Sequence, residues 1–260
     1  MTTIAFQKFQ GAGNDFIMID NREDLFPKNS SKLIEKLCNR KFGIGADGLI
    51  LLENSDEYDF KMNYYNSDGN ESTMCGNGGR CIVSFANKLL LFDKETTFEA
   101  IDGKHSASIE GETVELQMSD IVDVEYHQNY YFVNSGSPHH IILTTHLNLC
   151  NVVSEGRKIR NGAPYFEEGS NVNFVEKISE NHFKIRTYER GVEDETLACG
   201  TGATAVAVAM YDAKMTNINN LKIETLGGNL EVSFRKENKH FSNVFLKGPA
   251  TFVFKGEIDI

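Results

Sequence analysis

The chain has 260 residues, of which 40% are hydrophobic, and this suffices for one large or two medium folded domains. Its 26 basic and 37 acidic residues give a formal net charge of −11, so nothing in the charge favours a nucleic-acid partner. The start of the chain lacks a basic segment followed by an apolar run, and no apolar stretch approaches a membrane span. We therefore expect a cytoplasmic protein with no membrane partner.

The five cysteines are an odd number, and no Cys-x-x-Cys pair occurs. In a chain without an export signal, this pattern favours reduced thiols over a disulfide framework, a zinc finger or a thioredoxin-like redox motif.

The predicted elements are mostly short strands. A serine at Ser30 followed by helical spacing predicts a helix from Ser31 to Cys38 that stops near Gly43. Period-two alternation or apolar runs predict strands over 49–52, 60–65, 114–118, 183–188, 221–223, 230–234 and 252–254. Two more helices are expected after Cys75 and Cys199, and the second is apolar on nearly every side, as in a helix surrounded by protein.

This order predicts two mostly β units, each packing its sheet around a helix that begins at a Cys-Gly turn. The similarity of the two turns indicates an internal duplication. We expect an N-terminal domain over 1–118 that carries Cys75 and a C-terminal domain over 119–250 that carries Cys199. The boundary falls in the polar stretch near 117–128.

The segment Gly43–Gly48 matches the dinucleotide-binding fingerprint G-x-G-x-x-G. A functional fingerprint follows a strand and opens a helix, whereas here a predicted helix comes before the segment and a predicted strand after it. We interpret these glycines as tight-turn residues.

The two Cys-Gly turns carry the strongest functional signal. Cys75 precedes Gly-Asn-Gly-Gly and Cys199 precedes Gly-Thr-Gly, so each thiol is expected at the start of a helix. The positive end of the helix dipole lowers a thiol pKa, and the following N–H groups can hold a carboxylate. Cys38, Cys81 and Cys150 lie among apolar residues and fit the ordinary interpretation of inert buried thiols.

Inversion of a carbon centre requires a base on one face and an acid on the other. A thiolate and a thiol, each at a helix start, suit a reaction that runs both ways, with the helix termini stabilising the charge that forms on the carboxylate. The residues thus predict racemisation or epimerisation of an amino acid without pyridoxal phosphate, another cofactor or a metal.

Six sequence blocks resemble the diaminopimelate epimerases, which belong to the cofactor-independent racemases related to proline racemase. The blocks, in family order, are Lys8–Phe16, Phe42–Gly48, Tyr65–Arg80, Gly136–His139, Asn171–Phe174 and Tyr188–Gly202. The resemblance implies an α/β (α+β) fold of two pseudo-symmetric domains, each a mostly antiparallel sheet wrapped around a central helix, with the active site in the cleft between them. It also implies that the last strand, 251–260, returns to the first domain.

The implied reaction interconverts LL- and meso-diaminopimelate, a step toward lysine and peptidoglycan, with Cys75 and Cys199 as the acid–base pair and Cys75 as the base on the LL isomer. The resemblance also implies a homodimer. Asn14, Asn66, Asn171, Glu189 and Arg190 would contact the substrate, and Gly76, Asn77, Gly200 and Thr201 would donate backbone N–H groups to its α-carboxylate. His139 and Glu189 would tune the thiols.

Three positions depart from the family pattern, because many members carry Gln at Gly48, Asn at Ser137 and Ser at Asn70. These changes affect the expected substrate contacts and leave the thiols intact. Three alternatives stay open on the residues alone: a racemase for proline or hydroxyproline, a redox protein that links the two thiols reversibly, and a binding module. The first would leave the distal polar groups unpaired, and the last gives no reason for a second thiol.

Overall fold

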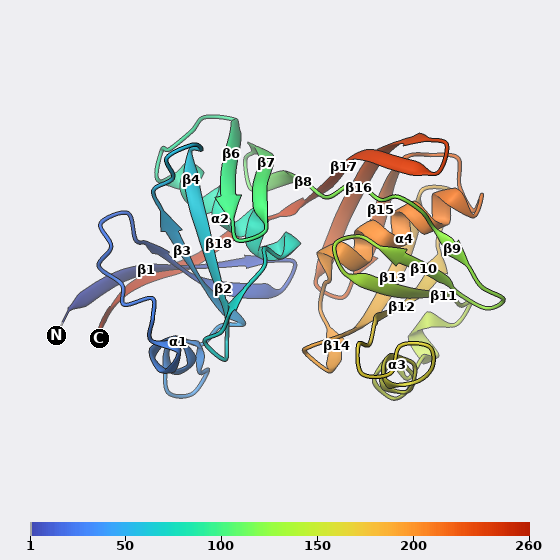
Figure 1. The fold of residues 1–260 in the computed structure, drawn as a ribbon, viewed down its shortest axis with the longest axis horizontal. Helices are drawn as coiled ribbons and strands as arrows, with labels where there is room; N and C mark the ends of the chain where they lie inside the picture. The colour runs from blue at the N-terminus through green and yellow to red at the C-terminus, as the bar shows by residue number, and fades with distance from the viewer. Residues whose placement is uncertain (1) are drawn as a thin grey trace. The chain divides into compact units, whose positions relative to one another are not determined.

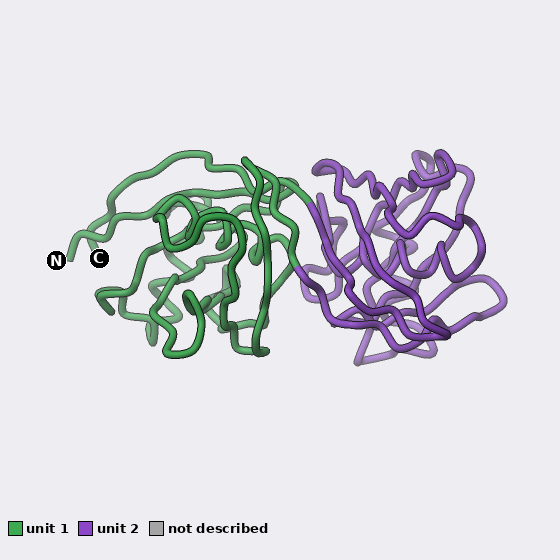
Figure 2. The backbone as a smooth tube through the Cα atoms, turned by 90° about the horizontal axis from the view of Figure 1, so that it is seen from above, with its two compact units in different colours: residues 1–116, 248–260 green, residues 117–247 purple. Residues whose placement is uncertain are grey.

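The computed structural model describes residues 2–260, and the chain in it forms two compact units (Figures 1 and 2). Unit 1 comprises residues 1–116 and 248–260, and unit 2 comprises residues 117–247. The chain therefore passes from one unit to the other twice. None of the helices in residues 2–260 is long and apolar enough to cross a membrane.

Unit 1 is built on strands that pair in both parallel and antiparallel directions. Its strands are β1 (Thr3–Gly11), β2 (Asn14–Asp20), β3 (Gly48–Glu53), β4 (Phe60–Asn66), β5 (Glu71–Ser72), β6 (Glu95–Ala100), β7 (Gly103–Glu110), β8 (Thr113–Gln117) and β18 (Thr251–Asp259). Its helices are α1 (Ser31–Cys38) and α2 (Gly76–Lys88). β18 pairs antiparallel with β1, so both ends of the chain lie on neighbouring strands.

Unit 2 follows the same plan. Its strands are β9 (Glu125–Tyr126), β10 (Tyr131–Asn134), β11 (Pro138–Leu143), β12 (Asn171–Lys177), β13 (His182–Glu189), β14 (Asp194–Thr196), β15 (Asn220–Thr225), β16 (Gly228–Glu237) and β17 (His240–Pro249). Its helical segments are η1 (Leu147–Leu149), α3 (Val152–Asn161) and α4 (Gly200–Asp212).

The strand pairings repeat from one unit to the other. In unit 1 the order β1-β2-β3-β4-β6-β7 contains parallel pairs at β2–β3 and β4–β6 and antiparallel pairs elsewhere. In unit 2 the order β10-β11-β12-β13-β15-β16 has its parallel pairs at the matching places, β11–β12 and β13–β15. The expected α+β class is confirmed, and the duplication extends from the two turns to the whole topology.

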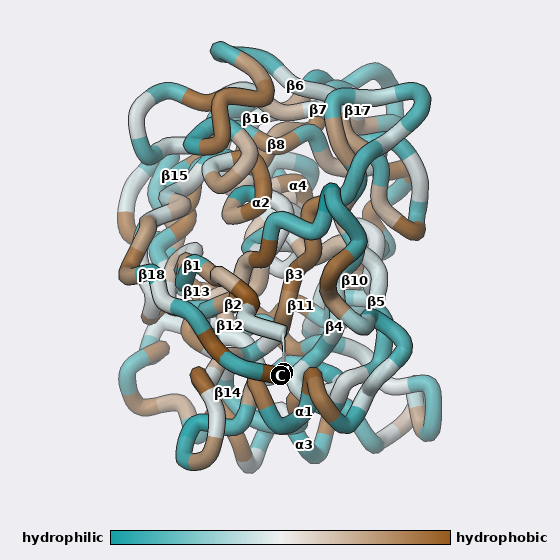
Figure 3. The backbone as a smooth tube through the Cα atoms, turned by 90° about the vertical axis from the view of Figure 1, so that its left-hand side faces the viewer, coloured by the Kyte–Doolittle hydropathy of each residue, from teal (hydrophilic) through white to brown (hydrophobic). Residues whose placement is uncertain are grey.

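Each unit wraps its sheet around one helix. In unit 1, α2 contacts β1, β2, β3, β4, β7 and β18, and in unit 2, α4 contacts β10, β11, β12, β15 and β16. Nearly every residue of α4 from Gly200 to Met210 is buried, as its apolar sequence predicts. Hydrophobic segments such as β3 are shown in brown along the strands in Figure 3, whereas the outer loops are mainly hydrophilic.

Two details of the sequence interpretation were wrong. The helix Ser31–Cys38 forms as predicted, but the Ser30 side chain makes no capping hydrogen bond, because the backbone there leaves the usual extended capping conformation. α3 was not predicted. Gly156 interrupts its pattern, and this helix has many charged residues and few buried ones.

Gly156 shows why this helix tolerates a glycine. A Cβ atom at position 156 would lie 2.3 Å from Cβ of Tyr188, which is fully buried on β13. The absence of a side chain at this position therefore lets α3 approach the sheet.

Gly156→Ala is expected to destabilise the protein by about 1–3 kcal/mol, because the added methyl group overpacks this contact. Urea unfolding at neutral pH measures the loss. The control Ser154→Ala, on the exposed face of the same helix, should change stability by no more than about 0.5 kcal/mol. Equal stability of Gly156→Ala and the wild type would contradict the packing argument.

Candidate active site

Cys75 occupies the N-cap position of α2, at the start of the central helix of unit 1. Its backbone is extended, and its Sγ accepts a hydrogen bond of 3.2 Å from the backbone N–H of Gly78. A Cβ atom on residue 78 would lie 3.2 Å from this sulfur and 3.1 Å from Ile50. The glycine thus allows the backbone donor to approach the thiol closely, and such donation favours a thiolate.

Cys199 occupies the matching N-cap position of α4 in unit 2. Its Sγ lies 3.4 Å from the hydroxyl oxygen of Thr201, and the residue is only 6% exposed. Gly202, three residues after Cys199, corresponds to Gly78 in unit 1. Packing again requires a glycine at this position, since a Cβ atom on residue 202 would lie 2.6 Å from Oδ1 of Asn173. Both predicted thiols are therefore at helix starts, with different hydrogen-bond partners.

Of the other three thiols, Cys38 and Cys81 are buried, as the sequence predicts, whereas Cys150 is only partly buried. Burial raises the pKa of Cys38 to about 12, and it raises the pKa values of Cys81 and Cys150 above their ordinary range. These thiols stay protonated at neutral pH and are unsuited to acid–base work.

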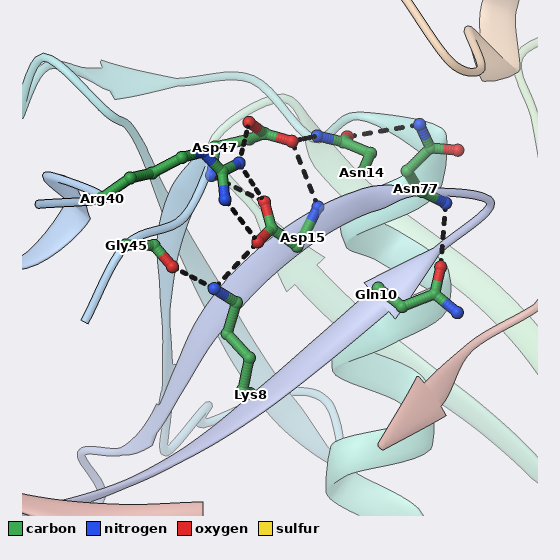
Figure 4. A network of polar contacts seen from close by, with 9 residues as sticks. Lys8, Gln10, Asn14, Asp15, Arg40, Gly45, Asp47 and Asn77 are labelled. Atoms are coloured by element: carbon green, nitrogen blue, oxygen red, sulfur yellow. Dashed lines mark hydrogen bonds and ion pairs between the residues drawn. The ribbon is translucent and has the colours of Figure 1, made fainter. Parts of the chain in front are cut away.

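Asn14 and Asn77 lie together beside the start of α2 (Figure 4). Nδ2 of Asn77 donates to Oδ1 of Asn14 at 3.2 Å, and Nδ2 of Asn14 donates to Oδ2 of Asp47 at 2.7 Å. These bonds fix which way both amides face, so two predicted substrate residues are already ordered.

An ionic cluster holds Asn14 in place through its hydrogen bond with Asp47 (Figure 4). Arg40 donates to both oxygens of Asp15, at 3.0 and 2.7 Å, and to Asp47 at 2.7 Å. Lys8, which is buried, pairs with Asp15 at 2.8 Å and also donates to the carbonyl of Gly45. Burial opposes ionisation of Asp15, but the hydrogen bonds from Arg40 and Lys8 prevail and hold its pKa well below the ordinary value.

The same cluster explains the glycine-rich segment. Gly45, with φ of +80°, presents its carbonyl to Lys8, and the segment Gly43–Gly48 joins α1 to β3 in the order that the sequence predicts. The segment forms a tight connection that carries Asp47.

Arg80 is a further site-supporting residue, which sequence reasoning did not identify. Its guanidinium is fully buried and donates to the carbonyl of Gly76 at 3.0 Å and to Oδ1 of Asn77 at 2.9 Å. Its place four residues after Gly76 was the available signal, because residues four apart on a helix share a face.

Asn66 lies at the end of β4, opposite Gly48 at the start of β3. A Cβ atom on Gly48 would lie 2.6 Å from the Tyr64 ring and 2.7 Å from the carbonyl oxygen of Tyr65. In this chain the Tyr64 ring therefore occupies the space that a side chain at position 48 would take. The backbone of Asn66 turns through hydrogen bonds with Gly69 and Asn70.

Asn171 and Arg190 lie together in unit 2. Oδ1 of Asn171 accepts from the backbone N–H of Arg190 at 2.9 Å, and its Nδ2 donates to Oγ of Ser137 at 2.9 Å. Arg190 donates through Nη1 to the carbonyl of Glu168 at 2.9 Å. Ser137, the second departure from the family pattern, thus holds Asn171 in place.

His139 is fully buried beside Cys199 and Thr201. Its Nε2 lies 3.0 Å from the Thr201 hydroxyl, and its Nδ1 lies 3.0 Å from Nδ2 of Asn173. Burial, assisted by the positive charge of Arg190, lowers the pKa of His139 to about 3. The imidazole is neutral at physiological pH. Glu189 ends β13 immediately before Arg190.

Each unit thus presents one thiol at a helix N-terminus, surrounded by polar groups from the ends of neighbouring strands. In unit 1 the structure brings together Cys75, Gly76, Asn77 and Asn14. In unit 2 it brings together Cys199, Gly200, Thr201, His139, Asn171 and Arg190. Backbone N–H groups at both helix starts can hold a carboxylate next to a thiol.

His140, next to His139, adds a pH dependence of stability. Its Nδ1 lies 2.8 Å from the Tyr165 hydroxyl and its ring stacks on Tyr130, and burial lowers its pKa to about 4. The unfolded histidine titrates near 6.5, so between pH 4 and 6.5 the unfolded chain binds more protons. The contribution of neutral His140 to the free energy of unfolding is therefore complete above pH 6.5 and is lost as pH falls toward 4.

The stability difference between the wild type and His140→Gln is therefore expected to shrink as pH falls from 7.5 to 5. Urea unfolding at several pH values measures this difference, with His146→Gln, at an exposed position, as the control that should follow the wild-type profile. A difference that stays constant with pH would show that His140 does not contribute in this way.

Comparisons with known proteins agree with this arrangement. The family model described as "Diaminopimelate epimerase" matches residues 6–124 and 131–253. The diaminopimelate epimerase of Flavobacterium psychrophilum is 60% identical over 252 residues, which cover 96% of this chain and 98% of that protein. The diaminopimelate epimerase of Chlorobaculum tepidum is 43% identical over 259 residues, covering 96% and 99%.

Solved structures share the fold at low sequence identity. A phenazine biosynthesis protein of the PhzF family from Bacillus anthracis superimposes with a TM-score of 0.80 at 16% identity, over 100% of both chains. A probable proline racemase from Agrobacterium radiobacter K84 gives a TM-score of 0.70 at 15% identity, over 99% of this chain and 93% of that one. With the fold in common and the family model matched across both units, the chain belongs to the diaminopimelate epimerase family.

Proposed function

We propose that the protein interconverts LL- and meso-diaminopimelate and that Cys75 and Cys199 are its two acid–base groups. The observation that carries this proposal is the pair of thiols, each at the N-cap of the central helix of one unit, in two units of the same topology. Membership of the diaminopimelate epimerase family supplies the substrate.

The proposed step moves two protons. A thiolate takes the α-proton from one face of the substrate carbon, and the electron pair of the broken C–H bond delocalises into the α-carboxylate. The opposite thiol then gives its proton to the other face, which forms the new C–H bond and inverts the centre. Cys75 is the base for the LL isomer and Cys199 for the meso isomer.

The helix starts support this step electrostatically. Backbone N–H groups of Gly76 and Asn77 in unit 1, and of Gly200 and Thr201 in unit 2, are proposed to bind the α-carboxylate. Donors placed in advance of the reaction stabilise charge as it forms, without reorganisation.

The distal end of the substrate is assigned to polar side chains. Asn66, Asn171 and Arg190 are proposed to bind the second carboxylate, and Glu189 the ammonium group. The Arg190 guanidinium carries five N–H donors in a planar fork suited to a carboxylate, and its backbone is tied to Asn171 at 2.9 Å. This pairing supports diaminopimelate over amino acids that lack a second carboxylate.

The proposed oligomeric state, location and partners rest on the family resemblance and the composition. We propose a homodimer in the cytoplasm that acts on a small molecule and uses neither nucleic acid nor a membrane as a partner. The acidic net charge of −11 supports the exclusion of nucleic acid.

Cys75→Ala and Cys199→Ala are each expected to reduce epimerisation by at least roughly 10²–10⁴-fold, because each removes one proton-transfer group. Chiral chromatography of product from LL-diaminopimelate measures the rate, and circular dichroism checks folding. The control Cys150→Ala removes a thiol outside both helix starts and should keep wild-type turnover. Near-complete turnover by either helix-start variant would exclude the two-base mechanism.

Arg190→Ala is expected to raise KM by about 10–100-fold, the range for a lost charged hydrogen-bond partner, with a smaller effect on kcat. Steady-state kinetics in both directions measure the two constants. Arg235→Ala, at an exposed position of unit 2, is the matched control. A wild-type KM for Arg190→Ala would remove this residue from the distal site.

A further inference from the structure

We propose that the Thr201 hydroxyl donates its proton to the sulfur of Cys199, and that His139, Asn173 and Thr187 are positioning residues that fix this direction. The inference rests on the proposed function, since it assigns a role around one of the two acid–base thiols. All five residues belong to unit 2.

The orientation of the Asn173 side-chain amide sets the direction of these hydrogen bonds. Asn173 and Thr187 face each other across β12 and β13, and both are buried. The Thr187 hydroxyl donates to Oδ1 of Asn173 at 3.0 Å, while Nδ2 lies 3.4 Å from the carbonyl oxygen of His140. A carbonyl oxygen only accepts, so the nitrogen of the amide belongs on that side.

The amide orientation then fixes the histidine tautomer. Nδ2 of Asn173 is 3.0 Å from Nδ1 of His139, so the amide donates and Nδ1 must be unprotonated. The buried imidazole is neutral and therefore carries its single proton on Nε2. That N–H donates to the Thr201 hydroxyl oxygen at 3.0 Å.

The tautomer of His139 finally fixes the direction in which the Thr201 hydroxyl donates. A threonine hydroxyl has one proton, and with its oxygen accepting from His139 this proton is directed away from the ring. Sγ of Cys199 lies 3.4 Å from the same oxygen and receives it. The resulting chain runs in one direction, Thr187 and Asn173 to His139 to Thr201 to Cys199.

This order assigns His139 a role other than a base. The histidine neither takes nor gives a proton during turnover, and its function is to keep the Thr201 hydroxyl turned toward sulfur. Donation to sulfur favours the thiolate form of Cys199. Cys75 receives comparable donation from a backbone amide, Gly78 N–H at 3.2 Å, so the two thiols obtain a similar environment from different groups.

The proton positions are tested directly by NMR of enzyme labelled with ¹⁵N-histidine. The expected spectrum shows His139 with its proton on Nε2 and an unprotonated Nδ1. In Asn173→Asp the carboxylate can only accept, so a proton is expected on Nδ1. A wild-type enzyme with the His139 proton on Nδ1 would overturn the proposal.

The hydroxyl is tested by kinetics. Thr201→Val keeps the backbone N–H and the side-chain volume but removes the donor, and kcat is expected to fall about tenfold with little change in KM. Thr201→Ser restores the hydroxyl and should recover most of kcat. Thr204→Val is the matched control, because Thr204 lies on the same helix and its hydroxyl donates to the carbonyl of Gly200. An unchanged kcat in Thr201→Val would overturn the proposal.

The two readouts separate this inference from the proposed function. If the His139 proton lies on Nε2 while the wild-type enzyme shows no epimerisation, the proposed function fails and the hydrogen-bond order stands. If the enzyme epimerises diaminopimelate but Thr201→Val is fully active, the function stands and the role of Thr201 is wrong.

Discussion

The start of a buried helix is the feature on which the rest of this structure depends. In each unit the sheet wraps around one helix, and that helix begins at a cysteine with extended backbone. Burial keeps water away from the helix, so the N–H groups and the dipole at its start act with less screening than at a surface. The thiol and the donors that we propose to bind the carboxylate are thereby provided by one element.

Polar networks surround each helix start and order the side chains in advance. In unit 1, the cluster of Lys8, Asp15, Arg40 and Asp47 holds Asn14, and Arg80 holds Asn77. In unit 2, Thr187 is hydrogen-bonded to Asn173 and Asn173 to His139, which in turn contacts Thr201. The buried members of these networks, such as Lys8, Arg80 and Asn173, are stabilising only when each has its partner, which makes the networks rigid as well as specific. The two units therefore share a topology but order the side chains around the helix start with different residues.

The sequence predicts the parts of the site that are local. Both Cys-Gly turns, the apolar α4 helix and strands such as β3 and β13 follow from spacing and periodicity. The supporting residues Asp47, Asn173 and Thr187 could not be found in this way, because strand register brings them to the site from distant positions. α3 was missed because Gly156 obscures its pattern, and only the packing against Tyr188 explains that glycine.

The central claim is that two thiols exchange the α-proton of diaminopimelate with solvent. Proton NMR of LL-diaminopimelate with reduced enzyme in D₂O tests it most directly, with proline, glutamate and lysine measured in parallel. The account predicts loss of the α-proton signal from diaminopimelate alone, with the meso isomer appearing on chiral analysis. Exchange on proline or another control would contradict the assigned substrate, and no exchange on any of the four would contradict the two-thiol chemistry.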